Sequence, residues 1–172
     1  LVRREQQVAQ VQEIGAAEAV VGDMLDGSVL RQATRGVRSV SHICPNVPPE
    51  EISIGKVIIS AAVDAGVQHF VFHSVLRPQV ETMPHHWRKM RVEEALFMSG
   101  LPFTILQPAS YMQNIIAIWE GVTERDVLTA PYSVHSQSSP VDMQDVAAVA
   151  TIVLCEPGHR GATYELCGPE VL

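Results

Sequence analysis

The sequence predicts an α/β fold in which helices cover both faces of a parallel sheet. Segments with helical patterns alternate with short β-rich runs along most of the 172 residues. The β-rich runs are continuously apolar or β-branched, as in strands that are covered on both faces. A βαβα order of this kind gives parallel strands joined by right-handed crossovers. Glycines that can adopt the left-handed conformation close four of the helical segments, at Gly15, Gly36, Gly66 and Gly100.

The expected elements can be placed in order from these signals. The chain opens in the last residues of a strand, 1–3, and continues into a helix over 5–14. A late helix is expected over 142–154, because Asp142 is a good N-cap and Asp145 stands three residues later, as in a capping box. The remaining strands are expected at 18–22, 39–44, 69–74, 102–106, 127–130 and 162–167.

The composition is that of a globular domain, and it argues against two kinds of partner. Apolar residues make up 47% of the chain and charged residues 18%, unlike a disordered chain. No apolar run is long enough to cross a membrane. The net charge is −7 and the basic residues are scattered, which argues against nucleic acid. The opening LVRREQQVAQ lacks the apolar part of a secretion signal, so a cytoplasmic location is expected.

No metal site is expected from the cysteines or the histidines. Cys44, Cys155 and Cys167 lack metal-ligand spacing and are expected to be free, buried thiols. His85 and His86 are adjacent, but no third ligand has a suitable spacing.

Polar side chains at strand ends are compatible with a bound dinucleotide, although the chain contains no glycine-rich phosphate loop. Arg3 and Arg4 end the first strand, where a guanidinium can hold a 2′-phosphate through two hydrogen bonds. Asp23 follows the strand 18–22 and could contact an adenine or a ribose. The alternatives are a solvated basic pair for the arginines and, for Asp23 together with Asp26, a turn or helix cap.

His85 and Lys89 are the strongest candidates for chemistry. They lie four residues apart in a helical segment, so their side chains address the same small volume. The strand 102–106 follows and ends near Pro108, at the sheet edge where open α/β folds bind ligands. A lysine there can hydrogen-bond a nicotinamide ribose and lower the pKa of a neighbouring acid. The alternative is a surface ion pair between Lys89 and Glu93.

The strand 69–74 ends in His73 and Ser74, which face the same predicted site. Ser74 could orient a substrate carbonyl, or it could simply form a turn. No G-x-S-x-G motif occurs, so the sequence gives no support to a hydrolase.

Several segments together resemble the NmrA-like family of atypical short-chain dehydrogenase/reductases. They are VVGDMLDGSVLRQATRGV, AAVDAGVQHFVFHSV, the H-x-x-x-K from His85 to Lys89, RVEEALFMSGLPFTILQPASYMQN, PVDMQDVAAVATIVL and GATYELCGPEVL. The resemblance implies that residues 1–172 form a partial NAD(P)-binding domain with a Rossmann-like doubly wound parallel sheet in three layers. The family's first strand, its glycine loop and its C-terminal part are missing from the sequence. That strand is central, so its absence predicts unpaired strand edges and a gap in the core.

The resemblance also implies contacts to NADP, with NAD as a possible alternative. Arg3, with Arg4 beside it, would contact the 2′-phosphate end of the adenosine. Asp23 and Met24 would flank the adenine.

Further along the chain, the resemblance assigns residues to the middle and the nicotinamide end of the cofactor. Cys44 and Pro45 would lie in the turn beneath the pyrophosphate and ribose. Lys89 would take the place of the short-chain dehydrogenase lysine. The loop that closes over the nicotinamide would consist of Tyr111, Met112, Gln113 and Asn114.

The catalytic pattern departs from that of ordinary short-chain dehydrogenases, Tyr-x-x-x-Lys, because position 85 is His. An imidazolium can donate a proton near neutral pH, so His85 and Lys89 are the expected catalytic residues. The implied function is an NAD(P)H-dependent oxidoreductase that acts on a small carbonyl, quinone or imine. The alternative is a non-enzymatic NADP(H) sensor that regulates a protein partner. A third possibility is that this 172-residue segment alone binds no cofactor.

Overall fold

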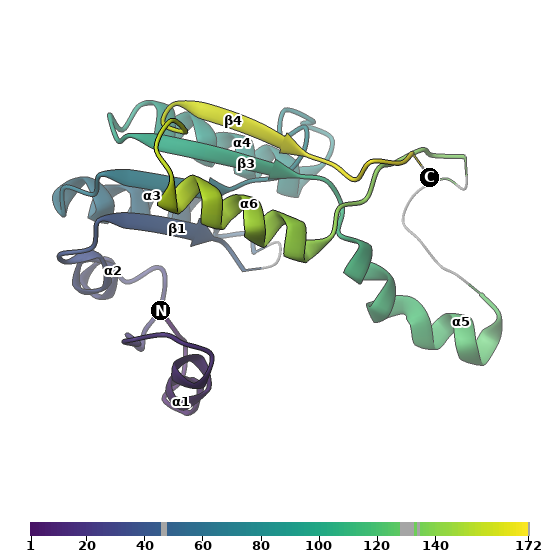
Figure 1. Ribbon diagram of the computed structural model, residues 1–172, viewed down its shortest axis with the longest axis horizontal. Helices are drawn as coiled ribbons and strands as arrows, with labels where there is room; N and C mark the ends of the chain where they lie inside the picture. Colours follow the sequence, from purple (N-terminus) through teal and green to yellow (C-terminus); the bar gives the residue numbers. More distant parts are fainter. Residues whose placement is uncertain (46–47, 128–132, 134, 172) are drawn as a thin grey trace.

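The chain forms a parallel four-stranded sheet with helices on both faces (Figure 1). The computed structural model describes residues 1–172 except 46–47, 128–132, 134 and 172. The strands are β1 (Ser39–Ile43), β2 (His69–His73), β3 (Phe103–Pro108) and β4 (Ala162–Leu166). The helices are α1 (Gln6–Glu13), α2 (Gly27–Thr34), α3 (Glu51–Asp64), α4 (Pro84–Phe97), the 3₁₀ helix η1 (Met112–Ile118), α5 (Trp119–Arg125) and α6 (Met143–Cys155).

The sheet follows the chain in the order β1-β2-β3-β4, and every neighbouring pair is parallel. A helix crosses between successive strands, as the alternation in the sequence predicted. β2 and β3 are the most deeply buried strands, because four of the five residues of β2 and five of the six residues of β3 are buried between the two helical layers. The predicted strands at 39–44, 69–74, 102–106 and 162–167 are confirmed to within two residues at each end.

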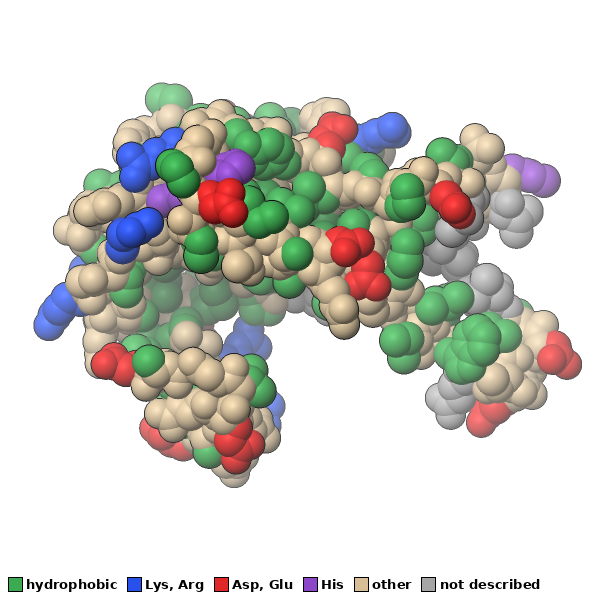
Figure 2. Space-filling view, viewed as in Figure 1, with side chains coloured by type: hydrophobic (Ala, Val, Ile, Leu, Met, Phe, Trp, Pro, Cys, Tyr) green, Lys and Arg blue, Asp and Glu red, His purple; other side chains and the backbone are tan. Residues whose placement is uncertain are grey.

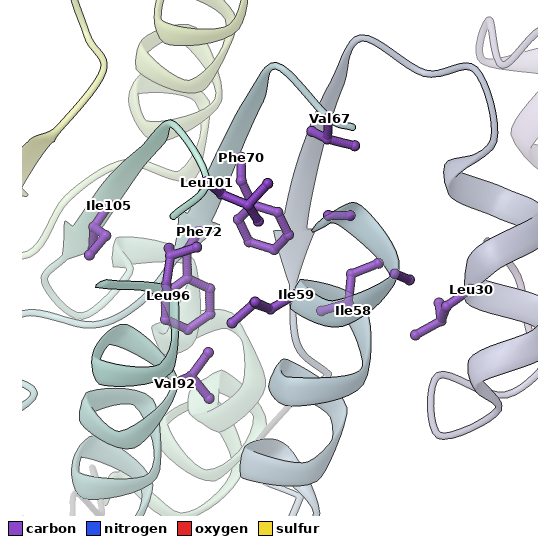
Figure 3. Close-up of a cluster of buried hydrophobic side chains, with 12 residues drawn as sticks. Leu30, Ile58, Ile59, Val67, Phe70, Phe72, Val92, Leu96, Leu101 and Ile105 are labelled. Carbon is purple, nitrogen blue, oxygen red and sulfur yellow. The ribbon is translucent and has the colours of Figure 1, made fainter. Parts of the chain in front are cut away.

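The larger core lies between the sheet and the layer of α2, α3 and α4 (Figure 3). Phe70 and Phe72 point from β2 into this layer and are fully buried. They meet Ile59 of α3 and Leu96 of α4, so apolar burial fixes both helices against the sheet. Gly55 lets the two helices approach closely, because a Cβ there would lie 2.6 Å from a methyl carbon of Val92.

The opposite face of the sheet is covered by α6, which completes three layers (Figure 1). Val71 and Leu106 alternate with the residues of the first core along their strands and pack against Val153 of α6. The predicted N-cap of this helix is confirmed, since Asp142 accepts a hydrogen bond from the Gln144 backbone N–H at 2.7 Å. The doubly wound, three-layered α/β fold is therefore confirmed.

Glycine closes the helices where the sequence predicted it. The four predicted glycines all have positive φ, from 66° at Gly66 to 107° at Gly15. The chain then turns into the next segment without the steric cost that a side chain would meet in this conformation.

The prediction of strands at 1–3 and 18–22 is wrong. They are reduced to a single parallel bridge between Val2 and Val21. Two backbone hydrogen bonds hold it, from Val2 N to the Val20 carbonyl and from Gly22 N to the Val2 carbonyl. A longer ladder would need a neighbouring strand to align it, and among the described residues β1 pairs only with β2.

A slot of about 540 Å³ separates this N-terminal bridge from β1. It is lined on one side by Leu1 to Arg3, on the other by Ser39 to Ile43, and at its base by apolar residues such as Leu30 and Ile58. In the space-filling view, the α1 segment stands apart from the main body with a hollow between them (Figure 2). A gap in the core was expected at this place in the sheet.

Three further expectations can be compared with the structure. No helix in the described ranges is long and apolar enough to cross a membrane. All three cysteines are free, as expected, but only Cys44 is buried, while Cys155 and Cys167 are exposed. Those two follow the last apolar positions of α6 and β4, beyond the packed layers. The strand expected at 127–130 lies outside the described residues except for Val127, which is exposed.

Candidate functional site

Polar side chains gather at the carboxyl ends of β2 and β3, the two inner strands of the sheet. His73 ends β2 and Ser74 follows it, while Gln107 and Tyr111 lie at and beyond the end of β3. This is the edge at which open parallel sheets bind ligands. The helices that cover this edge contribute Glu51, Lys89 and Glu93.

Lys89 is held at this edge by an ion pair from another helix. Its Nζ lies 2.7 Å from Oε1 of Glu51 on α3, and 3.4 Å from the His73 carbonyl oxygen. The Glu51 side chain is 1% exposed and that of Lys89 16%, so the pair is largely desolvated. The alternative prediction, a surface ion pair between Lys89 and Glu93, is therefore wrong. An ammonium has three N–H donors, and the described residues use two of them, which leaves one for a ligand.

Glu93 is buried in a hydrogen-bonded cluster of its own. Ser74 Oγ donates to Oε1 of Glu93, and Gln107 Nε2 donates to its two carboxylate oxygens at 2.9 and 3.1 Å. Burial raises the pKa of the Glu93 carboxyl, and the hydrogen bonds from Ser74 and Gln107 oppose that shift. The cluster ties α4 to the ends of β2 and β3, so it fixes the backbone from which Lys89 projects.

His73 and Tyr111 form a second polar pair at the same edge. Nε2 of His73 is hydrogen-bonded to the Tyr111 hydroxyl, and the two ring centroids are 6.2 Å apart. Burial lowers the pKa of His73 to about 4, and the nearby charge of Lys89 adds to the shift. Burial also raises the pKa of Tyr111. Near neutral pH the pair is thus a neutral imidazole and a protonated phenol.

His85 lies near Lys89 on α4, as their spacing predicted, but it has different properties. It is half-buried and its ring packs edge-on against His86, with centroids 4.4 Å apart. Burial lowers the pKa of His85, and the neighbouring His86 lowers it further. Its imidazolium form is therefore less populated at neutral pH than that of an ordinary histidine.

The N-terminal candidates lie along the slot rather than at the edge formed by β2 and β3. Arg3 and Met24 both line the slot, and Arg4 is exposed beside them. The backbone N–H groups of Arg3 and Arg4 are capped by Oε1 of Gln7, each at 3.0 Å. Asp23 caps its own turn, accepting a hydrogen bond from Leu25 N at 2.8 Å, as one alternative reading of the sequence predicted.

Cys44 and Pro45 follow β1 at its carboxyl end. Pro45 lines the slot together with Arg3 and Met24, so these three cofactor candidates share one cavity. Cys44 is 7% exposed. Burial raises the pKa of its thiol to about 11, and the charge of Glu51 contributes to that shift. The thiol therefore stays protonated and unreactive at neutral pH.

The segment from Tyr111 to Asn114 is not the loop that the sequence predicted. After Tyr111 the chain enters the 3₁₀ helix η1, and Tyr111 itself forms a parallel bridge with Val141. Oε1 of Gln113 accepts a hydrogen bond from Met143 N at 3.1 Å, which caps the start of α6. Met112 and Asn114 lie in η1 as well, with Met112 44% exposed.

The structure thus brings Lys89, His85 and Tyr111 together at one edge, and it adds polar residues that the sequence did not single out. The buried acids Glu51 and Glu93 and the side chain of Gln107 had no recognisable signal, because long-range packing decides their partners. His73 did have a signal, its place at a strand end. Within the described residues no cluster of three or more His, Cys, Asp or Glu is arranged to hold a metal.

Comparisons with known proteins agree with this fold. The profile of the NmrA-like family matches residues 1–162. The NAD(P)H azoreductase of Xenophilus azovorans is 30% identical over 171 residues, which cover 95% of this chain and 58% of the relative. Quinone oxidoreductase 2 of Escherichia coli is 26% identical over 162 residues, covering 93% of this chain and 56% of that protein.

A solved structure of the Escherichia coli NADPH-dependent quinone oxidoreductase, in complex with NADPH, superimposes with a TM-score of 0.87. It is 26% identical, and the alignment covers 99% of this chain and 59% of that protein. The chain therefore spans somewhat more than half the length of the relatives that it matches.

Proposed function

The chain belongs to the NmrA-like family, and from that premise we propose that it forms the nucleotide-binding part of an NAD(P)H-dependent oxidoreductase. The substrate class is a small carbonyl, quinone or imine-like acceptor. The observation that carries the proposal is the Lys89–Glu51 pair, which places an ammonium with one unused N–H at the carboxyl edge of the sheet.

The residues present fit a dinucleotide at two separate places. The slot beside β1 is lined by Arg3, Met24 and Pro45, which suits an adenosine with a negatively charged phosphate. Its wall also holds Nε2 of His42, a buried nitrogen without a hydrogen-bond partner among the described residues. The edge near Lys89 suits the ribose at the other end. A bound reduced dinucleotide would supply a hydride, and the chain's own residues would hold and orient it.

Arg3 is the residue from which we expect this protein to prefer NADP over NAD. Its guanidinium can form a charge-assisted, bidentate pair with a 2′-phosphate, which NADPH carries and NADH lacks. Lys89 would hydrogen-bond the ribose hydroxyls of either cofactor. Glu51 and the His73 carbonyl would hold its Nζ in place.

Replacement of Arg3 tests the cofactor assignment. In the full-length protein, Arg3→Ala should weaken NADPH about tenfold or more and leave NADH nearly unchanged, because a hydrogen bond to a charged group contributes about 1.5–3 kcal/mol. Isothermal titration with both cofactors measures the difference. Arg35→Ala is the matched control, since Arg35 is an exposed arginine outside the slot.

Equal losses of affinity for NADPH and NADH would show that Arg3 has only a structural role. Turnover is measured separately, as NADPH oxidation with a panel of quinones, azo compounds and aldehydes. A protein that binds NADPH tightly but is inert with the whole panel would contradict the oxidoreductase and favour a dinucleotide sensor.

A further inference from the structure

The pair formed by Tyr111 and His73 joins the two inner strands of the sheet at their carboxyl ends. His73 is the last residue of β2, and Tyr111 lies three residues beyond the end of β3. The hydroxyl of Tyr111 is bonded to Nε2 of His73, and both side chains are half-buried. The His73 carbonyl is also a hydrogen-bond acceptor for Lys89, so the pair adjoins the proposed ribose site.

The two nitrogens of the His73 ring have different surroundings. Nε2 is hydrogen-bonded to Tyr111, whereas Nδ1 has no hydrogen-bond partner among the residues that the structure describes. In the part of the chain that the structure describes, His42 Nε2 is the sole fully buried side-chain nitrogen or oxygen without a partner. Nδ1 of His73 is therefore not fully buried and can reach water. The imidazole thus connects solvent to the tyrosine hydroxyl.

The other titratable groups at this edge are less suited to give up a proton. The Lys89 ammonium is stabilised by the carboxylate of Glu51 at 2.7 Å. Glu93 is enclosed by Ser74 and Gln107 and is 3% exposed, so a ligand does not reach it. His85 has a lowered pKa and is mostly neutral near pH 7, and no hydrogen bond holds its ring in the described structure.

We propose that Tyr111 is the proton donor to the substrate and that His73 supplies it with a proton from water. The inference rests on the proposed function, because it names the acid of the same reduction. It assigns to Tyr111 a catalytic role in place of a cofactor-binding one, and to His73 the role of a positioning residue and relay.

A bound reduced dinucleotide would supply a hydride, with its electron pair, to the acceptor, and negative charge would develop on an oxygen or nitrogen of the acceptor. The O–H bond of Tyr111 breaks and the proton forms a new O–H or N–H bond on the product. The Nε2 proton of His73 moves to the phenolate oxygen, and water protonates Nδ1. The imidazole stays neutral, and exchange with water restores its first tautomer after the product leaves.

The protonation states agree with this sequence of transfers. The pKa of His73 is lowered to about 4, so the ring is neutral at pH 7 and has one N–H to donate. Burial raises the pKa of Tyr111, which keeps the phenol protonated until a strong base develops beside it.

Removal of the tyrosine hydroxyl is the direct test. In the full-length protein, Tyr111→Phe should lower kcat with a quinone or azo acceptor about 10²-fold, as loss of a general acid does, and leave the NADPH dissociation constant unchanged. His73→Phe should lower kcat by a smaller factor. Tyr164→Phe is the matched control, because Tyr164 on β4 is also hydrogen-bonded to a histidine, His159, at 2.9 Å. Unchanged kcat in Tyr111→Phe would overturn the proposal.

A second measurement does not depend on turnover. Nitrogen-15 NMR of the cofactor-free protein reports which ring nitrogen of His73 carries the proton. The proposal requires it on Nε2, where it donates to the Tyr111 oxygen and leaves the tyrosine proton free to face the substrate. A proton on Nδ1, with Tyr111 donating to Nε2, would overturn it. This result is independent of the proposed function, which is tested separately by NADPH binding and by NADPH oxidation with the panel of acceptors.

Discussion

At the scale of single residues, burial decides which side chains near the carboxyl ends of the strands carry charge. Lys89 and Glu51 form an ion pair at 2.7 Å, whereas burial lowers the pKa of His42 and of His73 and keeps both neutral near pH 7. His42 lies in β1, is 3% exposed and stacks on Phe72 with ring centroids 5.7 Å apart. A cation in that position would lose its hydration without gaining a partner.

His42 should make the stability of the fold depend on pH. Burial lowers its pKa to about 4, with repulsion from Lys89 and His73 adding to the shift. In the unfolded chain the same group titrates near 6.5, the ordinary pKa of a histidine. The folded state binds fewer protons between these values. The stability that neutral His42 contributes is therefore fully present above pH 6.5 and is lost as the pH falls through about 4.

His42→Phe should remove part of this loss and keep the aromatic contact with Phe72. The expected gain below pH 4 is about 3 kcal/mol relative to the wild type, from a shift of roughly 2.5 pKa units. Urea denaturation at pH 7 and at pH 4 measures it. His135→Gln, a change at an exposed histidine, is the control. An unchanged pH dependence in His42→Phe would contradict the assignment of His42 as the buried titrating group.

The sequence predicted local relations between these residues, but not their long-range partners. The spacing of His85 and Lys89 was enough to place both on one region of α4, because that relation is local. The partner of Lys89 was not predictable, because Glu51 comes from a helix 38 positions earlier in the chain. The same applies to Glu93, whose partners are Ser74, just beyond the end of β2, and Gln107 on β3. Tertiary packing decides these pairs.

At the scale of elements, the close contact between α3 and α4 holds the site together. Gly55 of α3 faces Val92 of α4, one turn from Lys89 along the helix. A Cβ on Gly55 would lie 2.6 and 2.7 Å from the two methyl carbons of Val92. The valine is fully buried and cannot move aside without disturbing the core.

Gly55→Ala should therefore destabilise the protein, although alanine is the better helix former. Overpacking costs about 1–3 kcal/mol, and the gain in helix propensity offsets roughly 1 kcal/mol of it. The double variant Gly55→Ala with Val92→Ala should be more stable than the sum of the two single changes predicts, because the second change removes the clash. Thermal unfolding of all three variants measures this, and strictly additive effects would contradict a direct contact.

The elements that the sequence predicted well are those with a strong local signal. Apolar runs that follow closing glycines located β1, β2 and β3 and the ends of the helices before them. The run at 18–22 carries the same signal and yet forms only the bridge at Val21. A strand is stabilised by its neighbours, and these residues have one bridged partner, at Val2, in the described chain. Hydrophobic pattern alone does not report the number of neighbours.

At the scale of the whole molecule, the N-terminal part is attached much less firmly than the rest. Two hydrogen bonds join Val2 to the residues around Val21, and the slot of about 540 Å³ separates this unit from β1. No residue of α1 is buried. β2, in contrast, lies between two strands and two helical layers.

Hydrogen exchange of the cofactor-free chain should resolve this difference. The amides of Val2 and Gly22 should exchange through local opening, close to the rate of an unprotected peptide. The amides of Phe70 to Phe72 should exchange only through global unfolding. Native-state exchange followed by NMR measures both sets. Equal protection in the two regions would show that the N-terminal unit is an integral part of the fold.

The free side of β1 has a consequence for handling the protein. Among the described residues β1 pairs with β2 alone, its residues line the slot on the other side, and Ile43 at its end is 61% exposed. A row of unpaired main-chain groups is a template on which a strand of another molecule can assemble. The isolated 172-residue chain is therefore prone to edge-to-edge aggregation. Because that process is bimolecular, protein concentration will limit its shelf life and yield more than the strength of its core.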